Sequence, residues 1–289
     1  MASESAVVEE VTIRELVNAI LVRKWLIVAA ALLGMILAMA AAWIMPSRYR
    51  ASVLVAPVSE TGAGSGGLGS IISQVGGLAS LAGLSADAGT RKAEAVAVLQ
   101  SEELTARYLV EENLLPVLFA DRWDDSRKEW KTGWRIGKPT IWEATRLFGR
   151  KVRSVSEDSK SGLLTISVVW TDPKLAAAWA NDLVRITNLT MRDKAISEAA
   201  RNIEYLKSEA AKTSVVQLQS AIYSILEAEI RKEMLARGSE EYAFRVIDPA
   251  VVPEKPAYPS VILWAIFGLV VGGGFASLFA LVRVGWLRA

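Results

Sequence analysis

The sequence predicts an α+β membrane protein, with two transmembrane helices flanking a periplasmic α/β base domain that carries a long protruding helical hairpin. Three observations support this fold class. An uncharged apolar run lies near each end of the 289-residue chain. Valine-rich alternating stretches between the runs predict a sheet. The stretch from Lys174 to Lys212 contains no glycine or proline and predicts a long helix.

Composition narrows the classes of function. The chain is 52% apolar, which is typical of a membrane protein, and its net charge of +2 does not indicate a nucleic-acid partner. Acidic and basic residues between the two apolar runs are nearly equal in number, so a polybasic lipid-binding surface is not indicated. Cysteine and histidine are absent, which excludes thiol nucleophiles, disulfides and Cys/His zinc sites. We therefore expect no metal, no cofactor and no catalytic residue.

Residues 1–24 precede the first apolar run and begin with an acidic segment. Apolar residues recur at helical spacing from Val11 to Val22, and Thr12 with Glu15 forms a capping-box pattern. This pattern indicates either a short amphipathic helix lying along the membrane or an ordinary helical entry to the next segment.

The first predicted transmembrane helix covers residues 25–45 and ends before Pro46. A cleaved signal peptide is the alternative, since Ala40 to Ala42 resemble a cleavage site. The acidic leader and the length of the apolar run favour an uncleaved span. Gly34, Ala38 and Ala42 give this helix a face of small residues that could meet the last helix, in the same chain or in a neighbour.

The second predicted transmembrane helix covers residues 260–282, which contain no charge. A run of this length spans a hydrocarbon core of roughly 30 Å as a helix, whereas a buried soluble helix seldom stays uncharged on every face. Pro253 and Pro256 predict a stiff, extended lead-in. Three glycines, in a GxxxG step and beside it, predict close packing with another helix. They are Gly268, Gly272 and Gly273.

Two spans place both termini on one side of the membrane and residues 46–259 on the other. Arg23, Lys24 and Arg283 favour cytoplasmic termini, although Arg48 and Arg50 weaken the bias at the first helix. We therefore expect a bacterial inner-membrane protein with a cytoplasmic segment 1–24, a cytoplasmic tail 283–289 and a periplasmic region between the helices.

Within the periplasmic region, three segments predict the base sheet: residues 48–57, 151–171 and 242–248. The glycine-rich residues 62–69 resemble a phosphate-binding loop but lack the following Lys-Ser/Thr, so an ordinary loop is predicted. Residues 71–84 are apolar and too short to cross a membrane, and we expect them to pack between subunits.

Three further segments lie between the first strand and the long helix. Residues 92–113 have the periodicity of one helix, and residues 142–149 predict a short one. The tryptophan-rich residues 121–137 predict either a sugar-binding platform or a solvated loop anchored by its rings.

The predicted helical arm covers residues 174–237. Asp172 is the expected N-cap, followed by Pro173 in the first turn, and Thr213-Ser214 is the expected break between two antiparallel helices. Such an arm has little core of its own, so neighbouring subunits are expected to support it. We predict oligomerisation contacts around Leu206 and Leu218.

The layout resembles the Wzz-type chain-length determinants, the bacterial polysaccharide co-polymerases, over nearly the whole chain. The resemblance is carried by five stretches in a characteristic order: residues 13–25, 49–57, 76–84, 171–188 and 243–256. The family's further Ser/Thr-Pro step before the last span is only approximated here by Tyr258-Pro259-Ser260.

The resemblance implies a homo-oligomer on the inner membrane that sets the chain length of a lipid-linked glycan. It implies a Wzy-type polysaccharide polymerase as partner, for O-antigen (lipopolysaccharide), capsule or exopolysaccharide. Some relatives carry a fused tyrosine kinase, but no Walker-type motif occurs here, so any kinase is expected as a separate chain. Two alternatives stay open: an export adaptor linking the inner membrane to an outer-membrane channel, and a carboxylate-based glycan hydrolase, for which the sequence nominates no acid pair.

Overall fold

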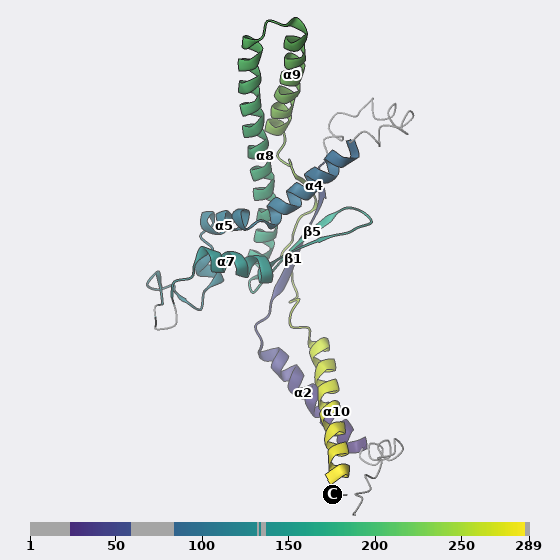
Figure 1. Cartoon of the computed structure of the whole chain (residues 1–289). Coiled ribbons are helices and arrows are strands. Elements are labelled where there is room, and N and C mark those ends of the chain that lie inside the picture. Colours follow the sequence, from purple (N-terminus) through teal and green to yellow (C-terminus); the bar gives the residue numbers. More distant parts are fainter. Residues whose placement is uncertain (1–23, 59–83, 132, 134–136, 287–289) are drawn as a thin grey trace, which may run out of the picture. The chain divides into compact units, whose positions relative to one another are not determined.

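The computed structural model describes residues 24–58, 84–131, 133 and 137–286, and the chain divides into two compact units (Figure 1). One unit combines residues 1–48 with residues 255–289, and the other comprises residues 49–254. The stretches expected to form an amphipathic helix, a glycine-rich loop and an apolar subunit contact, at residues 11–22, 62–69 and 71–83, lie outside the described residues.

The larger unit contains the expected sheet, which has four antiparallel strands in the order β4-β5-β1-β6. The strands are β1 (Tyr49–Pro57), β4 (Arg153–Glu157), β5 (Leu164–Trp170) and β6 (Phe244–Asp248). Strand β1 pairs with β5 from Tyr49 opposite Trp170 to Val55 opposite Leu164, and with β6 through a register shift after Leu54.

One face of the sheet forms the core. Val53 and Val55 of β1 and Ile166 of β5 are fully buried, because alternate residues of a strand point to the same face. The first half of α8 packs on this face and contributes buried Trp179 and Leu183. The core thus joins the sheet to the base of the helical arm.

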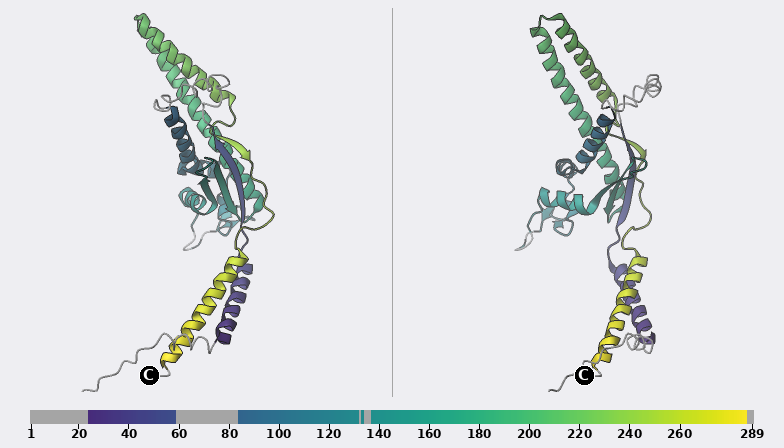
Figure 2. Two further views of the ribbon diagram at one scale, coloured as in Figure 1. Left: turned by 90° about the vertical axis from the view of Figure 1, so that its right-hand side faces the viewer. Right: turned by 45° about the vertical axis from the view of Figure 1, so that its right-hand side comes forward.

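The helical arm consists of α8 (Pro173–Lys212) and α9 (Val216–Gly238), which form the predicted antiparallel hairpin (Figures 1 and 2). The Asp172 carboxylate caps α8 by accepting hydrogen bonds from the backbone N–H groups of Lys174 and Leu175, at 2.8 and 3.3 Å. The segment between the helices contains Thr213 and Ser214, as predicted.

The remaining elements lie between β1 and α8, and two differ from the prediction. The expected single helix over residues 92–113 is two helices, α4 (Leu84–Gln100) and α5 (Glu102–Glu111). Ser101 separates them because its hydroxyl caps α5 by accepting from the Leu104 N–H at 3.1 Å. A serine before two acidic residues was the available sequence signal for this break.

The second difference concerns the start of β4. Helix α7 (Ile141–Leu147) continues into a π-helical turn, η3 (Phe148–Val152), so the strand expected from residue 151 begins at Arg153. Phe148 is fully buried against Tyr108 and Trp179, which holds this turn in the core. The other elements are α6 (Leu115–Leu118) and the short strands β2 (Trp123–Asp124) and β3 (Glu129–Trp130).

The smaller unit contains two long apolar helices, α2 (Lys24–Ile44) and α10 (Val261–Trp286). Both are long and apolar enough to cross a membrane, and only 6% and 11% of their most apolar stretches are buried within the protein. A core helix of a soluble protein would be mostly buried. Helix α10 continues a few residues beyond the predicted end at residue 282.

Candidate functional site: a glycine helix contact and an asparagine clamp

Helices α2 and α10 pack against each other through glycine. A methyl group built on Gly34 would lie 2.5 Å from the Gly268 carbonyl oxygen and 3.1 Å from the Gly272 Cα. A methyl group on Gly272 would lie 2.6 Å from the Ala30 carbonyl oxygen. The two backbones are therefore in direct contact, and the small-residue face of α2 meets the glycines of α10 in the same chain.

The glycines of α10 differ in how strictly the contact requires them. A methyl group on Gly268 would overlap the Gly34 carbonyl oxygen and lie 2.5 Å from the Ala38 Cβ. One on Gly273 would make an ordinary contact of 3.5 Å with the Ala31 Cβ, and one on Gly274 would meet nothing within 4 Å. A side chain at position 268 or 272 would therefore clash with α2, whereas Gly273 lies at the border of the contact.

The two predicted prolines lie outside this contact. Pro253 is half-buried and Pro256 exposed, in the segment of residues 249–260 that contains no helix or extended strand before α10 begins. Close to α10, the backbone of Arg48 pairs with Tyr258: the Arg48 N–H donates to the Tyr258 carbonyl at 2.9 Å, and the Tyr258 N–H donates back at 3.1 Å. This bridge joins the segments that follow α2 and precede α10.

The helix pair predicts a specific cross-link. The chain has no cysteine, so an engineered pair forms without competition. We expect Ala31→Cys with Gly273→Cys to form an intramolecular disulfide, because a Cβ at position 273 would lie 3.5 Å from that of residue 31, and disulfides join Cβ atoms roughly 3.5–4.5 Å apart. The measurement is monomer mobility on a non-reducing gel. Ala31→Cys with Gly274→Cys is the matched control and should stay reduced.

A second arrangement, which the sequence did not predict, anchors the chain segment after the arm. The buried side chain of Asn188 on α8 accepts hydrogen bonds from the N–H groups of Ala243 and Phe244, at 2.9 and 2.7 Å. Its amide nitrogen donates to the Phe244 carbonyl at 2.8 Å. The start of β6 is therefore bound to α8 by three hydrogen bonds from one side chain.

Asn181 repeats this interaction at the other end of the segment. Its amide nitrogen donates to the Ala250 carbonyl, and its oxygen accepts from the Ala250 N–H, both at 2.9 Å. Asn181 and Asn188 are seven residues apart and so lie on one face of α8. This asparagine clamp fixes both ends of residues 243–250 to the helix. Two asparagines one heptad apart on an otherwise apolar helix face were the sequence signal.

The clamp brings together two of the stretches that carry the resemblance, residues 171–188 and 243–256. In the second stretch Phe244 and Ala250 are buried at the clamp, whereas Ile247 and Val251 are 48% and 74% exposed. The asparagine side-chain amides form hydrogen bonds with backbone N–H and C=O groups that have no neighbouring strand on that side. The clamp therefore defines the path of the chain from the arm toward α10.

The two residues predicted for oligomerisation lie on different helices of the arm. Leu206 is half-buried on α8, and Leu218 on α9 is 52% exposed. Further large apolar side chains on α9 are exposed: Val216, Tyr223, Ile225, Met234 and Leu235. A helix packed on one partner normally buries its apolar stripe, so α9 presents more apolar surface than α8 covers.

Titratable groups in the described residues do not form a recognisable acid–base pair. The two carboxyls with shifted pKa values lie in exposed turns: a hydrogen bond from Lys128 lowers the pKa of Asp125, and one from the Lys160 N–H lowers that of Asp158. A general acid requires a shift in the opposite direction. No group of three or more acidic residues among those described could hold a metal ion. That the chain is not an enzyme stays a prediction.

Comparison with known proteins identifies a family that part of the chain resembles. Residues 9–112 match the family model described as Wzz, chain length determinant protein. The resemblance seen in the sequence is confirmed over this part of the chain. No match was found among curated protein sequences.

Two solved structures are similar to the chain at low identity. One is a full-length bacterial polysaccharide co-polymerase, with 10% identity, a TM-score of 0.39, and coverage of 96% of this chain and 99% of that one. The other is a fragment of WzzB, a polysaccharide co-polymerase from Salmonella Typhimurium. It has 10% identity, a TM-score of 0.30, and coverage of 73% and 99%.

Proposed function

We propose that this protein is a polysaccharide co-polymerase that regulates the chain length of a lipid-linked surface polysaccharide made by a Wzy-type polymerase. The observation that carries the proposal is the match of residues 9–112 to the chain length determinant family. The protein acts as a homo-oligomeric scaffold and not as an enzyme. The polymer is an O-antigen, a capsule or an exopolysaccharide.

The proposal places α2 and α10 in the bacterial inner membrane, with both termini in the cytoplasm and residues 46–259 in the periplasm. Two apolar helices with almost no burial support the membrane location, and the basic residues Arg23, Lys24 and Arg283 support cytoplasmic termini. Their glycine contact gives the membrane part a rigid pair of helices that can contact a polymerase.

The test is a gel analysis of surface glycans in a strain lacking the gene, with and without the gene restored. We expect the deletion to replace a clustered length distribution with a random one, and the restored gene to bring the cluster back. Unchanged lengths with loss of secreted polymer would instead identify an export adaptor. Shortened polymer after incubation with the purified protein would identify a hydrolase.

The exposed face of α9 predicts how subunits associate. We expect Leu218→Glu to weaken self-association about tenfold or more, because a carboxylate in an apolar contact leaves an unpaired charge. Sedimentation of the detergent-solubilised protein measures this. Gln217→Glu adds the same charge at the preceding exposed position and should leave the oligomer intact. Equal effects of the two changes would remove α9 from the proposed subunit contact.

A further inference from the structure

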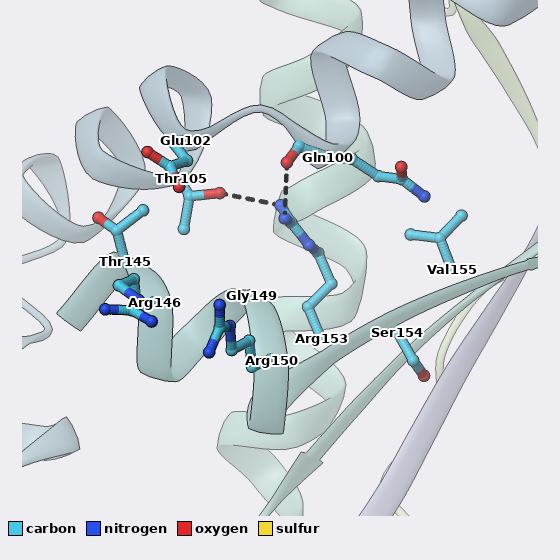
Figure 3. A pocket seen from close by; sticks show the side chains of 10 residues that line it. All are labelled: Gln100, Glu102, Thr105, Thr145, Arg146, Gly149, Arg150, Arg153, Ser154 and Val155. Atoms are coloured by element: carbon cyan, nitrogen blue, oxygen red, sulfur yellow. Dashed lines mark hydrogen bonds between the residues drawn. The ribbon is translucent and has the colours of Figure 1, made fainter. Parts of the chain in front are cut away.

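A pocket of about 460 Å³ opens in the larger unit between the start of α5, the end of α7 and the start of β4 (Figure 3). Its volume suits a small ligand or one unit of a larger one. Three arginines, Arg146, Arg150 and Arg153, line it with one acidic residue, Glu102. The pocket therefore carries an excess of positive charge.

The π-helical turn brings these arginines together. Arg146 and Arg150 are four residues apart and lie on one side of α7 and η3, and Arg153 follows the last residue of the turn. Gly149 lines the pocket between them and contributes no side chain to fill it. Single π-helical turns within helices are rare and occur frequently at functional sites.

Among the described residues, no ion pair neutralises the arginines of the pocket. Arg153 is 9% exposed and donates to the carbonyl oxygens of Leu99 and Gln100 and to the Thr105 hydroxyl, at 2.6, 3.1 and 2.9 Å. All three acceptors are uncharged, and burial lowers the pKa of the Arg153 guanidinium. These bonds use three of its five N–H groups. No ion pair in the described part of the chain joins Glu102 to any of the three arginines.

An exposed indole lies beside the pocket. The Arg146 guanidinium stacks over the ring of Trp142, 4.5 Å from its centroid, and the indole is still 62% exposed. Trp142 lies in the first turn of α7, which Thr140 caps by accepting from the Glu143 N–H at 3.1 Å. The indole is thus held on a capped helix, next to an arginine that belongs to the pocket.

Two of the three tryptophans of the sequence-predicted sugar platform, residues 121–137, are described by the structure, and Trp134 lies outside the described residues. Trp123 and Trp130 pack edge to face against each other, with ring centroids 4.9 Å apart, and both are half-buried. The two residues pair with each other across the short β2–β3 ladder. Trp142 therefore offers a more accessible aromatic surface than either of them.

We propose that the pocket binds an acidic sugar unit of a glycan chain, with Arg146 and Arg150 holding its carboxylate or phosphate. Arg146 covers one face of the Trp142 ring, and the other face stacks on a neighbouring sugar unit outside the pocket. The fork of N–H groups on a guanidinium can bind two oxygens of a carboxylate or of a phosphate, and an indole face matches the apolar face of a pyranose. Arg153 positions the site by joining β4 to the end of α4. That the sugar belongs to a growing polysaccharide rests on the proposed function.

The test is isothermal titration calorimetry on the full chain in detergent, with hexagalacturonate, maltohexaose and inorganic phosphate as separate probes. We expect hexagalacturonate to bind and the neutral maltohexaose not to bind. Arg150→Gln should weaken hexagalacturonate binding about tenfold or more, since a charge-assisted contact is lost. Arg127→Gln is the matched control: it removes the same charge from a side chain that is 80% exposed, outside the pocket, and should leave the affinity unchanged.

Trp142→Ala separates sugar from simple anion binding. It should weaken the binding of hexagalacturonate and leave the binding of phosphate unchanged, because only a sugar ring can stack on the indole. Phosphate binding stronger than hexagalacturonate binding in the wild type would show a bare anion site and overturn the proposal. Equal affinities of Arg150→Gln and Arg127→Gln, or no binding at all, would also overturn it. Chain-length control by the restored gene would survive such a failure, so the two proposals are tested independently.

Discussion

Replacing Gly268 by alanine is expected to separate α2 from α10. The added methyl group itself would overlap the Gly34 carbonyl oxygen, which is backbone and cannot rotate away. Overpacking of this kind costs about 1–3 kcal/mol, even for a single methyl group. Leucine at Gly268 and Gly272 should have a larger effect, because both positions contact the backbone of α2.

Two measurements check this result. In the Ala31→Cys, Gly273→Cys background, Gly268→Ala should lower the disulfide yield about tenfold, and the Gly268→Leu, Gly272→Leu protein should fail to restore clustered glycan lengths. Gly274→Leu is the matched control on the same helix, since its side chain would enter open space. Normal glycan lengths from the double leucine variant would show that the helix contact is dispensable for function.

Replacing Asn188 by alanine is expected to destabilise the larger unit by about 2–4 kcal/mol, because two N–H groups and one carbonyl would lose their partner in a buried place. All three groups belong to Ala243 and Phe244, and Phe244 is fully buried. Losing the clamp therefore frees the beginning of β6 and also disturbs the core.

Thermal unfolding of the solubilised chain followed by circular dichroism measures this change. For a unit of this size the midpoint should fall by roughly 6–12 °C. Asn202→Ala, at an exposed position of the same helix, is the control and should shift the midpoint far less. Asn188→Asp tests the geometry: its carboxylate can accept from both N–H groups but meets the Phe244 carbonyl without a donor. A midpoint for Asn188→Ala equal to that of Asn202→Ala would contradict the clamp.

The parts of the fold that sequence reasoning found are those specified by local pattern. Alternation of apolar and polar residues in 49–57 and 164–170 indicates a half-buried strand in each segment. The N-cap at Asp172 and the break near Thr213 indicate where α8 begins and ends. The uncharged runs were found within a few residues of α2 and α10. In each case the signal lies within the element itself.

The parts that sequence reasoning missed depend on contacts between distant residues. Asn188 binds backbone groups 55 and 56 residues away, and its heptad spacing from Asn181 marks it on the helix face without showing which backbone groups it binds. The arginine pocket is lined by residues of α5, η3 and β4, which are distant in the sequence from one another or joined by the π-helical turn that begins at buried Phe148. The small residues predicted close packing of the two apolar helices but left open whether the partner helix belongs to the same chain or to a neighbour, and the structure shows the contact within one chain.

The most direct test of the whole account is the side of the membrane on which the larger unit lies. A membrane-impermeant thiol reagent should label Ser214→Cys, at the turn between α8 and α9, in cells whose outer membrane alone is permeabilised. It should label Ala289→Cys only after lysis. Labelling of Ala289→Cys in unlysed cells, with Ser214→Cys protected until lysis, would contradict the account, because the arm would then lie in the cytoplasm, away from the polysaccharide it is proposed to regulate.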